Sequence, residues 1–211
     1  MIVPLAAAAA LLTVCSACSG ASTPTPPPNS LSTESSPSSA DNAGLKGTIA
    51  KSLAPSPAVV VLDPQDGTEL PVKTEVAVMD QAGFTFLPDL LIAQAGQEVQ
   101  FRNSEDILHN VRVTETSTQK PVFNVATLAF GKYEYRFEPG FYDVTCDIHS
   151  SMHASMLVTA SPYTASTAED GSFSMSDVRP GKYNLTIYAG KAPVVRPVEV
   201  KAGKTELGEI R

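Results

Sequence analysis

The pattern of hydrophobic and polar positions predicts an all-β protein from about residue 45 to the end of the 211-residue chain. Apolar and polar residues alternate over short runs, and Gly, Pro, Asp and Asn separate these runs. In QEVQFRN and KYEYRFE, for example, apolar or aromatic residues recur at every second position. No sequence pattern of a long amphipathic helix interrupts this alternation, so we expect β-sandwiches or barrels.

The same alternation predicts that two reactive side chains point inward. Cys146 has the parity of Tyr142 and Val144 in FYDVTC, so its thiol is expected in the core. His109 has the parity of Val111 in HNVRV, which directs its imidazole toward the same interior.

The first 18 residues are expected to be a signal peptide that ends in a lipobox. The run MIVPLAAAAALLTVCSACSG is apolar but too short for a membrane anchor, and it lacks the usual positively charged start. Small residues flank Cys18, which makes it the candidate lipidation site. The alternative is an ordinary secretory signal that is cleaved near Ala17 or Ala21.

Residues 19–44 are rich in Ser, Thr and Pro and are expected to be a linker without a core. The protein would then be exported to the periplasm or outer cell surface, and a lipid anchor on a bacterial membrane would hold it there. If Cys18 is lipidated and Cys15 is removed, Cys146 remains as a lone thiol that cannot form an internal disulfide. An oxidising compartment would threaten this thiol unless it were buried or bound to metal.

The stretch CDIHSSMHASMLV gathers residue types that bind soft metal ions. Cys146, His149 and Met152 have the spacing C-x2-H-x2-M, and a trigonal or tetrahedral site needs one more ligand, for which His109 is the candidate. Two His and one Cys with a weak axial Met form the ligand set of a blue-copper electron-transfer site. Zinc also accepts one thiolate and two imidazoles, so it stays open as an alternative.

Two segments resemble the two halves of a cupredoxin, FLPDLLIAQAGQEVQFRNSEDILHNV and YEYRFEPGFYDVTCDIHSSM. The resemblance covers residues 76–159 and implies a Greek-key β-sandwich with one type 1 copper site. The short loop between the Cys and the Met is similar to that of amicyanin.

The resemblance also implies a role for each matching residue. His109, Cys146 and His149 would be the equatorial copper ligands, and Met152 would be the axial ligand. Asn110 matches the position whose side chain tethers the two ligand loops, here through the backbone beside Cys146. The edge of His149 would be the port for electrons.

A second resemblance concerns the flanking segments. EDGSFSMSDVRPGKYNLTIYAG resembles the carboxypeptidase regulatory-like, or transthyretin-like, β-sandwich, and KGTIAKSLAPSPAVVVLDPQDG is similar to its first two strands. We therefore expect a split module, made from residues 45–75 and 160–211, into which the cupredoxin is inserted. The alternative assigns the earlier segment to the cupredoxin. The resemblance implies a structural or recognition role without catalysis.

Composition narrows the class of function. A formal net charge of −7 argues against a nucleic-acid partner. The chain has three His, so a blue site would leave one, too few for a second catalytic copper, and we expect no enzyme. The expected function is single-electron transfer between redox protein partners. His153 and Met156 motivate an alternative, a copper-handling protein that delivers copper without redox cycling, and a third possibility is an adhesion protein that has lost its metal.

Overall fold

The computed structural model describes residues 43–211, apart from 52, 54–56 and 190–191. The predicted signal peptide, the lipidation candidate Cys18 and most of the predicted linker lie outside these residues. The predicted all-β class is confirmed, because the regular structure of the described residues consists of strands, which form sandwiches. The described part of the chain contains no helix that could cross a membrane.

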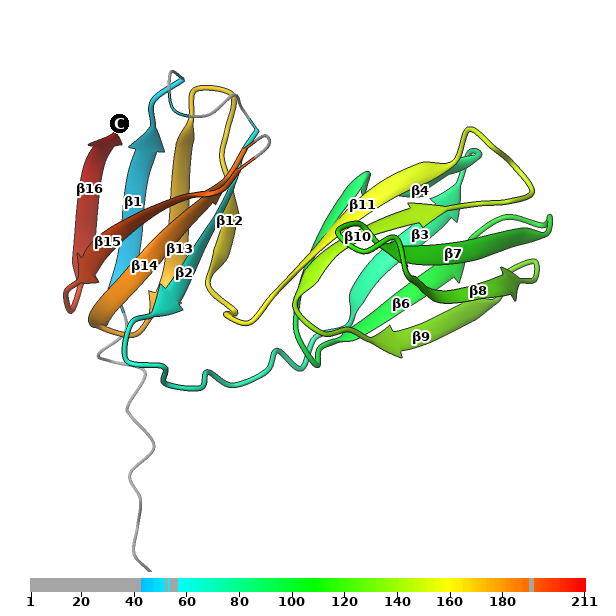
Figure 1. Cartoon of the computed structure of the whole chain (residues 1–211), viewed down its shortest axis with the longest axis horizontal. Coiled ribbons are helices and arrows are strands. Elements are labelled where there is room, and N and C mark those ends of the chain that lie inside the picture. Colours follow the sequence, from blue (N-terminus) through cyan, green and yellow to red (C-terminus); the bar gives the residue numbers. More distant parts are fainter. Residues whose placement is uncertain (1–42, 52, 54–56, 190–191) are drawn as a thin grey trace, which may run out of the picture. The chain divides into compact units, whose positions relative to one another are not determined.

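The central sandwich is built from strands β3 to β11 (Figure 1). In the described residues its two sheets have the strand orders β5-β11-β10-β7-β8 and β4-β3-β6-β9. The strands are β3 (Ala77–Ala82), β4 (Thr85–Leu87), β5 (Leu90–Gln94), β6 (Glu98–Asn103), β7 (His109–Glu115), β8 (Pro121–Thr127), β9 (Lys132–Arg136), β10 (Gly140–Thr145) and β11 (His153–Thr159).

The core between these sheets follows from the alternation seen in the sequence. Val99 and Phe101 on β6 are fully buried, whereas Arg102, the residue after Phe101, points to the other face and is exposed. On β10, Tyr142 and Val144 face the same core, and Cys146 just beyond the strand end joins them. The predicted inward orientation of the thiol is therefore confirmed.

The flanking sandwich is built from strands that lie before and after the central sandwich in the sequence. Its sheets have the orders β13-β1-β16 and β12-β2-β14-β15 in the described part of the chain. The strands are β1 (Ala43–Ile49), β2 (Val59–Pro64), β12 (Thr164–Ser166), β13 (Ser172–Val178), β14 (Gly181–Tyr188), β15 (Val194–Val200) and β16 (Lys204–Ile210).

Both early strands pair within the flanking sandwich. Strand β1 lies between β13 and β16, and β2 lies between β12 and β14. Strand β1 begins at Ala43, two residues inside the segment expected to be linker, because Ala43 is buried in this core and pairs with Val178.

A buried amide shapes the loop that leads into β7. Asn103 Nδ2 donates to the backbone oxygens of Ile107 at 2.8 Å and Leu128 at 3.0 Å. Its Oδ1 accepts the backbone N–H of Glu105 at 2.9 Å. Because the side chain is 1% exposed, these bonds are not exchanged with water, and they hold the loop before His109 against the turn after β8.

Each of the two sandwiches contains a tyrosine whose hydroxyl bonds back to the turn before its strand. The sequences EPGFY and RPGKY each place a tyrosine after a Pro-Gly turn. Tyr142 Oη donates to the backbone oxygen of Glu138 at 2.9 Å, and Tyr183 Oη donates to that of Arg179 at 2.7 Å. Each bond fastens the start of a core strand to the turn before it.

We expect Tyr183→Phe to lower the free energy of unfolding by about 1 kcal/mol at neutral pH, since it removes the bond to Arg179. Burial raises the pKa of Tyr183 to about 12, whereas the unfolded phenol titrates near 10. The unfolded state therefore ionises first, and the stability contributed by the neutral phenol is complete below about pH 10 and is lost as the pH rises toward about 12.

The measurement is denaturant unfolding followed by far-ultraviolet circular dichroism, because the chain has no Trp for fluorescence. The stability difference between wild type and Tyr183→Phe should shrink from neutral pH to about pH 11. A difference that stays constant over this range would show that the phenol is not buried in the neutral form.

Candidate metal centre

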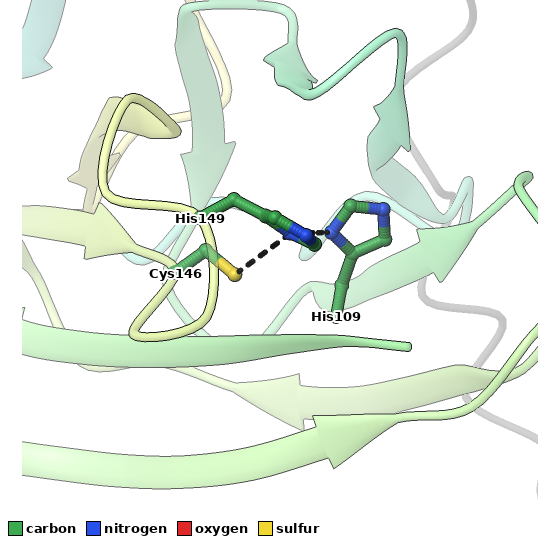
Figure 2. Close-up of side chains that lie close together, drawn as sticks. All are labelled: His109, Cys146 and His149. Atoms are coloured by element: carbon green, nitrogen blue, oxygen red, sulfur yellow. Dashed lines mark hydrogen bonds between the residues drawn. The ribbon is translucent and has the colours of Figure 1, made fainter. Parts of the chain in front are cut away.

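Three donor side chains meet at one end of the central sandwich. His109 is the first residue of β7, Cys146 directly follows β10, and His149 lies in the loop between β10 and β11. One ligand atom from each residue lies within 4.8 Å of the others (Figure 2). His149 Nδ1 is 3.0 Å from His109 Nδ1 and 4.0 Å from Cys146 Sγ. The structure thus brings together three of the four residues assigned to copper from the sequence.

The contact made by His109 Nε2 leaves His109 Nδ1 free to bind a metal ion. His109 Nε2 lies 2.9 Å from Glu105 Oε2. When Nε2 carries the proton and donates it to this carboxylate, Nδ1 presents a free lone pair toward Cys146 and His149. Since the imidazole is fully buried, its orientation is held by the protein rather than by water. This donor set fits a soft or borderline cation such as copper or zinc.

Glu105 also binds a second loop. Its Oε2 accepts the backbone N–H of Phe84, in the turn between β3 and β4, at 3.4 Å. Partial burial raises the pKa of the Glu105 carboxyl, but the hydrogen bonds from Phe84 and His109 outweigh this effect and hold the pKa below its ordinary value. The carboxylate is therefore ionised at neutral pH, as the bond to His109 Nε2 requires.

The ligand loop is closed on itself by backbone bonds. Cys146 N donates to Met152 O at 3.2 Å, and Met152 N donates to His149 O at 2.9 Å. The Met152 side chain is 1% exposed and belongs to the same core cluster as Cys146. Met152 is thus a buried residue at the end of the loop that carries Cys146 and His149.

Asn110 connects the loop to β7. Its Oδ1 accepts the backbone N–H groups of Asp147 at 2.6 Å and Ile148 at 3.3 Å, and it lies 3.3 Å from Cys146 Sγ. One amide oxygen therefore fixes the two residues that directly follow Cys146 and also contacts the thiol itself.

A polar ring on the outside supports this connection. Asn110 Nδ2 donates to Asn124 Oδ1 at 2.7 Å, and Asn124 Nδ2 donates to Asp147 Oδ2 at 2.8 Å. Arg112 donates to the same carboxylate oxygen at 2.7 Å. The hydrogen bonds from Arg112 and Asn124 hold the pKa of Asp147 below its usual value, so the carboxylate keeps accepting both bonds at neutral pH.

Two further residues of the sequence stretch lie apart from this donor set. His153 is exposed at the start of β11. Met156 is fully buried in the core, as its parity with Val158 predicts. Sequence reasoning did not identify Glu105 or Phe84. Their only signals were an acidic residue four positions before His109 and an aromatic residue in a Gly-containing turn.

Comparison with known proteins gives partial matches. The family model described as polysaccharide lyase family 4, domain II, matches residues 141–207, less than half of the chain. No curated protein matches the chain. Among solved structures, a purple cupredoxin from Nitrosopumilus maritimus is 20% identical over 39% of this chain and 99% of that one, with a TM-score of 0.35.

Two amicyanin structures are similar to the same degree. A mutant in its reduced Cu(I) form is 23% identical over 47% of this chain and 97% of that one, with a TM-score of 0.37. A second Cu(I) mutant is 22% identical over 39% of this chain and 81% of that one, with a TM-score of 0.36. Because these values are low, the candidate centre is judged by its own geometry.

We expect Asn110→Ala to lower the free energy of unfolding by about 1–3 kcal/mol, because it leaves the backbone N–H of Asp147 without its acceptor. The matched control is Arg112→Ala, which removes an ion pair whose side chains are 46% and 43% exposed and should change stability by less than about 1 kcal/mol. Denaturant unfolding of both variants, followed by circular dichroism, checks this. Equal effects would mean that the amide does not hold the loop.

Proposed function

We propose that the protein is a type 1 (blue) copper protein that carries single electrons between redox protein partners in the cell envelope. The observation that carries the proposal is the convergence of two imidazole nitrogens and one buried thiol. His109, Cys146 and His149 would hold the ion, with Met152 as a weak axial donor. When bound, copper would supply the one-electron couple between Cu(I) and Cu(II).

The contribution of the protein would be to keep the donors in place in both oxidation states. The Asn110 amide holds the backbone beside Cys146, and the Glu105 carboxylate holds His109. These hydrogen bonds are made by side chains and backbone groups that do not themselves change charge during electron transfer. A donor set that moves little lowers the reorganisation that each transfer requires.

The surroundings of His149 support its role as the electron port. The imidazole is half-buried, whereas that of His109 is fully buried. Among the described residues, five exposed apolar side chains lie in the loops at this end of the sandwich: Phe84, Leu108, Leu128, Phe130 and Ile148. Two sets of hydrogen bonds hold the loop before β7 to the turn after β8. Asn103 Nδ2 donates to the backbone oxygens of Ile107 and Leu128, and Phe130 N donates to Glu105 O. Apolar side chains of this kind are typical of the core of a protein interface, so a redox partner would approach His149 here.

The proposal extends to the cellular context. We propose that the protein is exported and lipid-anchored through Cys18, with the Ser/Pro/Thr-rich segment as a tether. Membrane contact would be made through the anchor alone, and nucleic acid would not be a partner. The flanking sandwich would have a structural or recognition role. With His153 as the one imidazole outside the proposed site, we propose electron transfer without catalysis.

The position of Met156 favours a carrier over a copper-handling protein. A protein that delivers copper needs donors that a partner can reach, and Met156 is fully buried in the core. His153 is exposed, but one imidazole alone does not form a transfer site. The buried thiol instead suits an ion that stays in the protein.

Titration of the purified metal-free chain with Cu(II) tests the proposal. We expect one equivalent to give an intense blue absorption band and an electron-paramagnetic-resonance spectrum with small copper hyperfine splitting. Cys146→Ser should remain a folded β protein and lose the band, because the charge transfer needs a thiolate. A blue variant would exclude Cys146 as the ligand, and a colourless wild type that binds zinc or Cu(I) would contradict the electron-carrier function.

Met152→Leu should retain copper and raise its reduction potential. The axial thioether stabilises the oxidised ion more than the reduced one, so its loss favours the reduced state. The matched control is Met79→Leu on β3, which replaces another fully buried thioether of the same core and should leave the potential unchanged. Cyclic voltammetry of both variants makes the measurement. An unchanged potential in Met152→Leu would move the axial role to another residue, with Met156 next to be tested.

A further inference from the structure

Phe84 lies directly against both imidazoles. Its ring centroid is 5.0 Å from that of His149 and 6.2 Å from that of His109, with interplanar angles of 86° and 75°. Both contacts are edge-to-face, the arrangement that aromatic rings prefer. The side chain is 51% exposed, so one part of the ring covers the histidines while another part faces solvent.

The backbone at Phe84 is strained. Gly83 and Phe84 form the turn between β3 and β4 with φ values of 64° and 56°. Glycine adopts this left-handed region freely, but a phenylalanine there is uncommon and unfavourable. Asn or Gly at position 84 would form the same turn with less strain. The turn itself does not favour a phenylalanine at position 84, so we infer that the contacts of the phenyl ring account for the residue found there.

Glu105 couples this turn to the donor set. A single carboxylate oxygen, Oε2, accepts the backbone N–H of Phe84 and also lies 2.9 Å from His109 Nε2. The position of the ring and the position of the imidazole are thus set by the same group. Any displacement of the turn away from the site would have to stretch or break a bond to the carboxylate.

We propose that Phe84 is a lid residue that fixes the orientation of His149 and prevents small solutes from reaching the metal. The inference rests on the proposed copper site. With the ring in place, a chelator has no direct approach across the two imidazoles, whereas an electron can still pass through the half-buried edge of His149. The lid makes the centre retain its ion, and this is the property that separates a carrier from a protein that delivers copper.

Phe130 provides a matched control in the same chain. It is also an exposed phenylalanine with a φ of 56°, and its backbone N–H is also bound by Glu105, through the backbone oxygen at 3.1 Å. Among the aromatic pairs of the described residues, none joins Phe130 to His109 or His149. The two rings thus share exposure and strain but differ in their contact with the donors.

The first experiment uses the full chain loaded with Cu(II), and it measures the rate at which an excess of EDTA removes the ion. Phe84→Gly relieves the backbone strain and removes the ring. It should speed the loss of copper roughly three- to tenfold, the change in rate expected when the interaction energy of one aromatic pair is lost. Phe130→Gly should leave the rate unchanged. Phe84→Asn, which also tolerates the left-handed turn, should match Phe84→Gly. Equal rates in the Phe84 and Phe130 variants would overturn the proposal.

The second experiment uses the metal-free chain, so it does not depend on copper. Proton NMR should show the ring protons of His149 shifted in Phe84→Gly and unchanged in Phe130→Gly, because of these two phenylalanines only Phe84 lies close enough for its ring current to act on them. Unshifted protons in Phe84→Gly would overturn the proposal. If wild type takes up no copper, the proposed function fails, while this spectrum still decides whether the Phe84 ring lies against His149.

Discussion

The candidate centre depends on one amide oxygen that joins two distant segments. Asn110 stands at the start of β7 beside His109, and the loop that it holds carries Cys146 and His149. Its bond to the backbone of Asp147 fastens the loop after β10 to the strand that supplies the first histidine, and the exposed ion pair between Arg112 and Asp147 adds a second link between the same segments. The distance between the two imidazoles is therefore a property of this bridge rather than of either segment alone.

The sequence predicts the orientation of the donors well, because orientation is a local property. Alternation along β7 and β10 is enough to direct His109 and Cys146 into the core, where their exposures are 0% and 4%. The spacing within a short loop likewise limits where His149 and Met152 can lie. The strand bounds follow from the same alternation and from the turn residues, although β1 starts slightly earlier than the composition suggests.

The contacts between loops could not be predicted in the same way. Glu105 and Phe84 are both ordinary loop residues in the sequence, and their importance arises because the β3–β4 turn and the β6–β7 loop meet in space. No periodicity encodes such a meeting, since it depends on the pairing of β3 with β6 and on the packing of two sheets. The parallel pairing of β1 with β16 cannot be predicted from the sequence for the same reason, because the two strands lie near opposite ends of the described chain.

This pairing has a consequence for the order of events during synthesis. Every strand of the central sandwich lies between Ala77 and Thr159, so its partners are all available once that stretch has left the ribosome. Of the described strands, β1 emerges first, but it pairs with β13 and β16, and β16 ends at Ile210. The earliest described strand thus lacks its first neighbour until β13 has been made and its second until β16 has been made. The sandwich that carries the candidate metal centre can therefore fold before the flanking sandwich has all of its strands.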